Sequence, residues 1–233
     1  MKLHWLWILI LLNVTACASK QTVMVGDEPV TINYSKGHGK TFIHLHHNEQ
    51  TALRAAEAVV QREGGSIISL EHRGGRNIVF YLQGTRHEFD PNRIFSDEGI
   101  RKTLSMFGPY SLKAHQEVQK LAQKIKAILP EGKIVAVHNN AGYSLKNYLS
   151  GNSLEQEAQA VHLVPSKYFR NFYLVTQIQD YLRLKSQGFN GVLQKKAATD
   201  DGSLSVYLAK NEYINVEAGF DQLAEQIKML QHA

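Results

Sequence analysis

Hydrophobic and polar positions along the chain alternate with two periods, one typical of strands and one typical of helices. Runs rich in β-branched and aromatic residues predict strands at 22–25, 30–34, 40–46, 66–70, 77–82, 133–137, 172–176, 191–194 and 213–216. Helical spacing or capping signals predict helices at 51–62, 111–129, 153–161, 177–185 and 220–231. The polar stretch 84–93 is expected to be a loop, and the pattern at 204–209 fits either kind of element.

The order of these elements predicts the fold class. Strands that alternate with helices indicate a three-layer α/β domain, with a central mixed, largely parallel sheet flanked by helices. At 233 residues the chain has the length of one domain with a full core. We expect a single folded domain over 40–233, preceded by a spacer and opening strands at 17–39 and a targeting segment at 1–16.

Composition and charge narrow the function classes. Hydrophobic residues make up 43% of the chain and charged residues 20%, which is ordinary for a globular protein. The net charge of +5 is spread along the sequence. Lys120, Lys124 and Lys126 fall on one predicted helix and indicate a solvated face. No basic and aromatic motif accompanies them, so we expect no nucleic-acid partner, and no protein partner is predicted.

The first residues indicate export and anchoring. A mostly apolar run over 3–14 is too short to span a bilayer comfortably. It ends in Val14-Thr15-Ala16-Cys17, which resembles the lipobox of bacterial lipoproteins, although a simple signal peptide is the alternative. Cys17 is also the chain's single cysteine. The resemblance implies lipidation of Cys17 and membrane attachment by that anchor. Ala18-Ser19 lacks the aspartate that favours inner-membrane retention, so we expect the periplasmic face of the outer membrane.

The densest group of metal-binding side chains is His44-Leu45-His46-His47-Asn48-Glu49. It lies where a predicted buried strand gives way to a helix. The His46-x-x-Glu49 spacing lets two ligands from one turn converge on a single ion, and a catalytic zinc site needs three protein ligands and an open position. A polar loop with surface histidines is the alternative interpretation of this stretch alone.

Two further polar residues follow predicted buried strands. His138 ends the strand at 133–137, and Glu217 ends the strand at 213–216. Sites in open α/β sheets gather at the carboxyl ends of strands, so these residues are expected to meet the His46 turn at one rim. His138 then supplies a third ligand and Glu217 a free carboxylate, which is the equipment for metal-assisted amide hydrolysis. Taken singly, His138 is equally typical of a core histidine and Glu217 of a residue near a helix start.

These residues, with Asp90-Pro91-Asn92-Arg93-Ile94-Phe95, resemble the signature of zinc carboxypeptidases and their aspartoacylase and succinylglutamate desuccinylase relatives. That superfamily has H-x-x-E, an Asn-Arg pair, a late His and a Glu near the C-terminus, in this order. The turn 46–49 is similar to the H-G-N-E of the desuccinylase branch, with His47 in place of glycine. Segment 90–95 is similar to that branch's D-L-N-R-x-F, with Pro91 in place of leucine.

The resemblance implies a zinc-carboxypeptidase-like fold and a role for each matched residue. His46, Glu49 and His138 would hold Zn²⁺, and Glu217 would act as general base and then acid. Asn92 and Arg93 would bind the free carboxylate of the substrate, for which a guanidinium is well shaped. Arg86 would polarise the scissile carbonyl, with Arg76 as the alternative.

Two departures from the family pattern leave positions open. Only sixteen residues follow Glu217, too few for the added β domain of aspartoacylases. The family also places a tyrosine over the substrate, for which this chain offers Tyr143, Tyr148 and Tyr207. His44 and His47 have no family role and are expected at the periphery of the site.

The leading hypothesis is a periplasmic zinc hydrolase that cleaves a peptide bond beside a free carboxylate. An N-acyl amino acid amidohydrolase with the same site is the second hypothesis. A non-catalytic lipoprotein that binds peptides or cell wall is the third. Intact candidates for every catalytic role, Glu217 above all, favour an enzyme. The expected partners are therefore a small peptide or N-acyl amino acid substrate, and the membrane through the lipid anchor.

Overall fold

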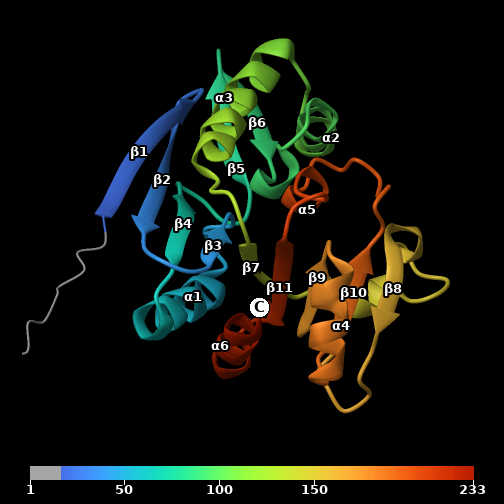
Figure 1. Ribbon diagram of the computed structural model, residues 1–233. Helices are drawn as coiled ribbons and strands as arrows, with labels where there is room; N and C mark the ends of the chain where they lie inside the picture. The colour runs from blue at the N-terminus through green and yellow to red at the C-terminus, as the bar shows by residue number, and fades with distance from the viewer. Residues whose placement is uncertain (1–16) are drawn as a thin grey trace, which may run out of the picture.

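The computed structural model describes residues 17–233 (Figure 1). The strands are β1 Cys17–Val25, β2 Glu28–Lys36, β3 Thr41–His44, β4 Ser66–Glu71, β5 Ile78–Leu82, β6 Thr85–Phe89, β7 Ile134–Asn140, β8 Ala158–His162, β9 Phe172–Val175, β10 Gly191–Gln194 and β11 Tyr213–Gly219. The helices are α1 Gln50–Glu63, α2 Asp97–Phe107, α3 Leu112–Ile128, α4 Ile178–Ser186, α5 Leu204–Tyr207 and α6 Leu223–His232. Short 3₁₀ turns lie at Pro91–Arg93, Leu145–Tyr148 and Glu155–Glu157.

Nine strands form one mixed sheet in the order β1-β2-β4-β3-β7-β11-β9-β10-β8, and β5 and β6 form a separate hairpin. The pairs β3–β4, β3–β7, β7–β11 and β9–β10 are parallel. The pairs β1–β2, β2–β4, β9–β11 and β8–β10 are antiparallel. The prediction of a mixed sheet is confirmed, but the sheet is not largely parallel, because four of its eight strand pairs are antiparallel.

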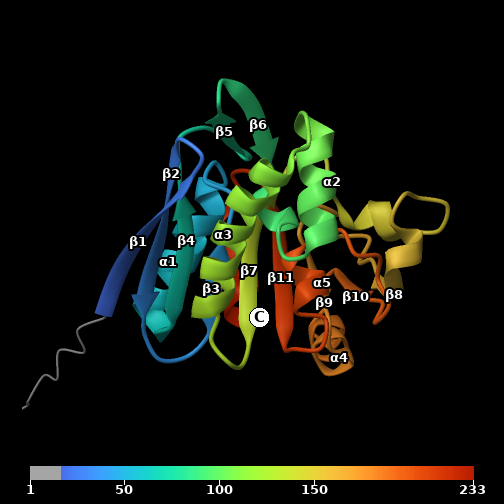
Figure 2. The ribbon, with the colours of Figure 1, turned by 90° about the horizontal axis from the view of Figure 1, so that it is seen from above.

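Helices cover both faces of the sheet (Figures 1 and 2). One core cluster joins α2 and α3 to the sheet through residues such as Leu104, Leu121 and Ile43. The other joins α1, α4 and α6 to the opposite face through residues such as Ala56 and Phe42. Ile43 and Phe42 are neighbours on β3 and point to opposite faces, as strand geometry requires. The three-layer α/β prediction is therefore confirmed.

Most predicted elements are found within a few residues of their expected bounds, including the strands that lead into the candidate site. The prediction of a helix at 153–161 is wrong. The segment's capping-box spacing predicts a helix, but 158–162 forms edge strand β8, which pairs with β10. The segment 84–93 is not all loop, because β6 pairs with β5 and only alternate residues, His87 and Phe89, are buried. Helix α2 was not expected.

The predictions for the N-terminus fall partly outside and partly inside the described residues. The expected signal segment, 1–16, lies outside the described residues. Cys17, expected to follow it, is the first residue of β1 and pairs in register with Lys36 of β2. The stretch expected as a spacer is therefore largely strand. Over residues 17–233, no helix combines the length and apolar character needed to cross a bilayer.

Candidate metal centre

The turn between β3 and α1 places two of the predicted ligands. β3 ends at His44, and the chain then turns so that the Glu49 amide donates to the His46 carbonyl at 3.0 Å. Glu49 occupies the N-cap position of α1. The side chains of His46 and Glu49 are 0% and 1% exposed. A strand end and a helix start, both packed in the core, therefore hold these groups in fixed positions.

The third predicted ligand comes from β7, the parallel neighbour of β3. His46 Nδ1 lies 3.0 Å from His138 Nδ1 and 3.0 Å from a carboxylate oxygen of Glu49. His138 Nδ1 lies 2.9 Å from the other Glu49 oxygen. The three groups can offer ligand atoms that all lie within 4.8 Å of one another, and all three residues are buried. The sequence prediction that they converge is confirmed.

These separations fit a small metal ion. Tetrahedral zinc with bonds of about 2.0–2.2 Å sets its ligand atoms roughly 3.3–3.5 Å apart, so slight expansion of the observed triangle is enough. Two imidazole nitrogens and one carboxylate oxygen are also a donor set that catalytic zinc uses. The group can therefore hold a metal ion, although the geometry does not identify which one.

Asp90 fixes the orientation of one ligand. It immediately precedes the Pro91–Arg93 turn, and its carboxylate accepts both the Asn92 amide and His46 Nε2–H, each at 2.7 Å. With Nε2 bound in this way, His46 Nδ1 is the nitrogen left to face Glu49 and His138. Carboxylates commonly orient metal-binding histidines through the second ring nitrogen. Asp90 belongs to the motif 90–95, but its position in that motif did not predict this role.

The charges around His46 determine its protonation. Burial lowers the pKa of the imidazole, but the carboxylates of Glu49 and Asp90 outweigh this and raise it to about 9. Burial raises the pKa values of the two carboxyl groups, yet the contacts with His46 hold both well below their usual range. The two carboxylates therefore favour the protonated, positively charged form of His46.

Neighbouring His44 differs from His46. Its Nε2–H donates to the Glu49 carbonyl at 3.0 Å, which braces the turn from within. Burial lowers the pKa of His44 to about 4. His47 is half-buried and its ring packs 5.6 Å from that of His72. Both histidines lie outside the ligand group, as expected.

Glu217 lies beside His138 because β11 pairs with β7 in parallel register at these two residues. Its carboxylate is buried, and its two oxygens accept N–H groups from Asn140 at 3.0 Å and Asn215 at 3.1 Å. The sequence analysis missed both asparagines. Their positions carried a signal, since Asn140 is two residues after His138 and Asn215 two residues before Glu217, which places each pair on one face of its strand.

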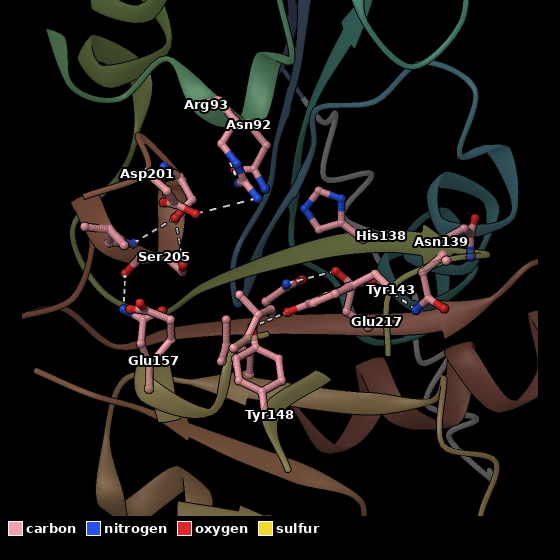
Figure 3. A pocket seen from close by; sticks show the side chains of 18 of the residues that line it. Asn92, Arg93, His138, Asn139, Tyr143, Tyr148, Glu157, Asp201, Ser205 and Glu217 are labelled. Atoms are coloured by element: carbon pink, nitrogen blue, oxygen red, sulfur yellow. Dashed lines mark hydrogen bonds and ion pairs between the residues drawn. The ribbon is translucent and has the colours of Figure 1, made fainter. Parts of the chain in front are cut away.

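A cavity of about 690 Å³ opens over this group. Glu49 is among the residues that line it. His138, Glu217, Arg93 and Tyr143 also line it and are labelled in Figure 3. The Tyr143 and Tyr148 hydroxyls are hydrogen-bonded to each other. Of the tyrosines named from the sequence, these two line the cavity, whereas Tyr207 is half-exposed and stacks on Phe95. Ligands that enter the cavity therefore meet two of the predicted metal ligands and Glu217 together.

Asn92 and Arg93 also face the cavity, as predicted. Asn92 Oδ1 accepts the Leu204 amide at 3.1 Å, and Arg93 Nη2 lies 3.6 Å from an Asp201 carboxylate oxygen. The segment around Gly202 can pack closely against the start of α2 because the residue that faces Gly202 there, Gly99, is also a glycine. A Cβ on Gly99 would lie 2.2 Å from Gly202 Cα. This contact holds the Asn-Arg turn against the cavity wall.

Arg86 does not join the site, which corrects its predicted position. It lies on β6 in the separate hairpin, with its side chain exposed and paired with Glu88. Strand alternation buries His87 and Phe89 and turns Arg86 outward. The alternative, Arg76, lines the cavity. Its guanidinium contacts the Glu49 carboxylate and lies 3.5 Å from that of Asp90.

Comparison with known proteins adds no identification: no protein-family model, curated protein or solved structure matches the chain.

Proposed function

We propose that the protein is a zinc-dependent hydrolase that cleaves an amide bond beside a free carboxylate. The observation that carries this proposal is the pairing of β7 with β11, which sets the Glu217 carboxylate next to the buried His46, Glu49 and His138 group at one cavity. A buried ligand set with an adjacent carboxylate on the open side is what metal-assisted hydrolysis requires.

His46 Nδ1, His138 Nδ1 and the Glu49 carboxylate would hold the zinc ion. Once bound, zinc polarises a carbonyl oxygen and makes water acidic enough to attack at neutral pH. Asp90 keeps His46 in the orientation that presents Nδ1, through its 2.7 Å contact with Nε2.

Glu217 is the proposed proton carrier. Its carboxylate takes a proton from the attacking water and passes it to the nitrogen of the leaving amine. Asn140 and Asn215 hold its two oxygens, so the carboxylate cannot rotate away from the reaction centre. Arg76, which replaces Arg86 in this role, supplies positive charge at the cavity edge for the oxygen on which negative charge develops.

Arg93, with Asn92, is proposed to bind the substrate's free carboxylate. Asn92 Oδ1 accepts the Leu204 amide, so the Nδ2–H groups of Asn92 are the ones that can donate to a substrate carboxylate. A guanidinium can donate two parallel hydrogen bonds to a carboxylate and so orient the substrate. This selects substrates that end in a carboxylate next to the cleaved bond, either peptides or N-acyl amino acids.

We also propose that the protein acts in the periplasm as a lipoprotein, attached through Cys17. That location favours peptides, including cell-wall peptides, over the acyl amino acids of the cytoplasm. A substrate panel of free peptides, carboxyl-amidated peptides and N-acyl amino acids separates the two enzyme hypotheses. Equal cleavage of free and amidated peptides would contradict the role given to Arg93.

The test of the mechanism is the substitution Glu217→Gln. This variant should bind zinc like the wild type but lose at least about 100-fold in kcat, because general acid–base catalysis typically contributes 10²–10⁴-fold. Glu157→Gln is the matched control, since Glu157 lines the same cavity but is held by Thr199. Unchanged turnover in Glu217→Gln would remove Glu217 from the mechanism.

Hydrolysis that is absent from the zinc-loaded wild type across the whole panel would reject the enzyme proposal. A non-catalytic binding protein would then be the remaining hypothesis.

A further inference from the structure

Two asparagines beside Glu217 have acceptor atoms that no described residue uses. Asn140 at the end of β7 and Asn215 on β11 line the cavity and are only 6% and 5% exposed. Each donates its Nδ2–H to Glu217, and Asn140 donates a second N–H to the Arg170 carbonyl at 3.0 Å. Because these partners are acceptors, the orientation of both amides is determined. The Oδ1 atoms are buried and have no partner among residues 17–233.

Such atoms call for an explanation. A buried carbonyl oxygen without a hydrogen bond costs free energy, and native proteins usually satisfy it with protein, water or ligand. Of the six buried side-chain atoms in this condition in the described part of the chain, two are the Oδ1 atoms of Asn140 and Asn215 at this cavity. Their concentration here indicates that a ligand completes the bonding.

The missing ligand has to be a hydrogen-bond donor. Asn215 and Glu217 share one face of β11, and Asn140 lies on the same side of adjacent β7. Together they offer the Glu217 carboxylate and two amide oxygens, while both N–H groups of Asn140 and one of Asn215 are already used. A primary ammonium group carries three N–H donors and one positive charge, which matches three acceptor groups and one negative charge.

We propose that Asn140, Asn215 and Glu217 bind a primary ammonium group, and that with Arg93 they make the cavity a receptor for a free α-amino acid. Such an amino acid is the amine product of the proposed hydrolysis. The inference rests on the proposed function in one respect, the role of Arg93 in binding a carboxylate. The ammonium site itself rests on the two amide oxygens.

The two charged ends of an amino acid find opposite charges in this cavity. Arg93 and Glu217 both line it (Figure 3). Arg93 Nη1 donates to the Asn92 carbonyl at 2.9 Å, and Nη2 is 3.6 Å from Asp201. Other guanidinium N–H groups are left for the ligand's carboxylate.

The test is calorimetric titration of the purified protein with L-alanine, L-glutamine and L-lysine, which represent three side-chain classes. The best of these is compared with its N-acetyl and its carboxamide derivatives. Both derivatives should bind at least about tenfold more weakly, because each removes a charged hydrogen-bonding group. Equal affinity for the amino acid and its N-acetyl derivative, or no binding of any of the three, would overturn the proposal.

A substitution adds a second measurement. Asn215→Leu should weaken binding of the free amino acid at least about tenfold while binding of the N-acetyl derivative changes little. Asn33→Leu is the matched control. Asn33 also donates to a glutamate, Glu71 at 3.4 Å, and leaves a buried Oδ1 without a partner, but it lies on β2 and does not line the cavity. The ligand comparison stands on its own if Asn215→Leu does not fold.

These outcomes are separable from those of the proposed function. A protein that binds amino acids but hydrolyses nothing would reject the hydrolase proposal and keep the ammonium site. Hydrolysis of peptides without binding of any free amino acid would do the reverse.

Discussion

At the scale of single residues, His46 is constrained at both ring nitrogens. Asp90 accepts from Nε2, and Nδ1 faces Glu49 and His138. This arrangement orients the imidazole for metal binding before any ion arrives. It also makes the affinity for metal depend on a carboxylate that is not one of the ligands.

Asp90→Asn should weaken zinc binding by about 10–100-fold, the usual effect of losing such a supporting carboxylate. Competition against a chromophoric chelator measures the affinity. Asp97→Asn is a suitable control, because Asp97 also contacts a histidine, His115 Nε2 at 3.3 Å, but on α2 outside the site. Equal losses in the two variants would show that the effect is not specific to His46.

The raised pKa of His46 predicts how metal affinity depends on pH. Burial alone would lower this pKa, but Glu49 and Asp90 raise it to about 9. Below that pH a binding metal must displace a proton from His46, so the association constant should rise about tenfold per pH unit until it levels near the pKa. Competition titrations from pH 6 to 8 check this. An affinity that is constant over this interval would contradict the assigned protonation.

At the scale of elements, the site depends on how α1 is joined to β7 and α6. Asn139 Oδ1 accepts the Ala52 amide at 2.8 Å, and Asn139 Nδ2 donates to Gln226 Oε1 at 2.9 Å. Gln226 Nε2 in turn donates to the His138 carbonyl at 2.9 Å. This buried chain of amides links the start of α1, next to Glu49, to the strand that carries His138.

Gln226→Leu should lower the free energy of unfolding by about 1–3 kcal/mol, because it removes the acceptor of the buried Asn139 Nδ2 and a hydrogen bond to the His138 carbonyl. Chemical denaturation measures the change. Gln231→Leu on the same helix should have little effect, since Gln231 makes an exposed contact with Glu63. Similar losses in both variants would indicate a general effect on α6 rather than on the amide chain.

The sequence predicts elements well where burial dominates the pattern. The strands before His46, His138 and Glu217 are short apolar runs, and their order along the chain is enough to place the three residues at one rim. Prediction from the sequence fails where contact with a neighbouring strand determines the secondary structure. β8 has a helix-like capping signal but pairs with β10 at the sheet edge, and β6 appears polar because its outer face carries Arg86 and Glu88.

The same contrast holds within the site. His46, Glu49 and His138 are found by residue type and spacing. Arg76 and Arg86 cannot be told apart in this way, because the choice depends on which way a hairpin turns its side chains. Asn140 and Asn215 are equally hidden, since asparagines are common near strand ends and only the parallel register brings these two to Glu217.

At the scale of the whole molecule, the parallel centre of the sheet determines where the site lies. β3, β7 and β11 are consecutive parallel neighbours, so their carboxyl ends meet at one rim although His46 and Glu217 are 171 positions apart in the sequence. The antiparallel strands on both sides extend the sheet without contributing ligands. A cavity at this rim is where an α/β domain is expected to bind its substrate.

The proposed attachment to a membrane also concerns the whole molecule. Lipidation of Cys17 would place the anchor at the first residue of β1, directly on the folded domain. Cys17→Ser should therefore abolish incorporation of an alkyne-labelled fatty acid in a Gram-negative host and release the protein from the membrane fraction. Labelling that persists in the variant would contradict the assignment of Cys17.

Whether His46, Glu49 and His138 hold zinc beside Glu217 can be measured directly by anomalous diffraction at the zinc absorption edge, from crystals of the zinc-loaded protein. One strong peak is expected, bound by His46 Nδ1, His138 Nδ1 and the Glu49 carboxylate, on the side of the group that faces the cavity and Glu217. Absence of a peak at this position, or coordination by other residues, would contradict that expectation.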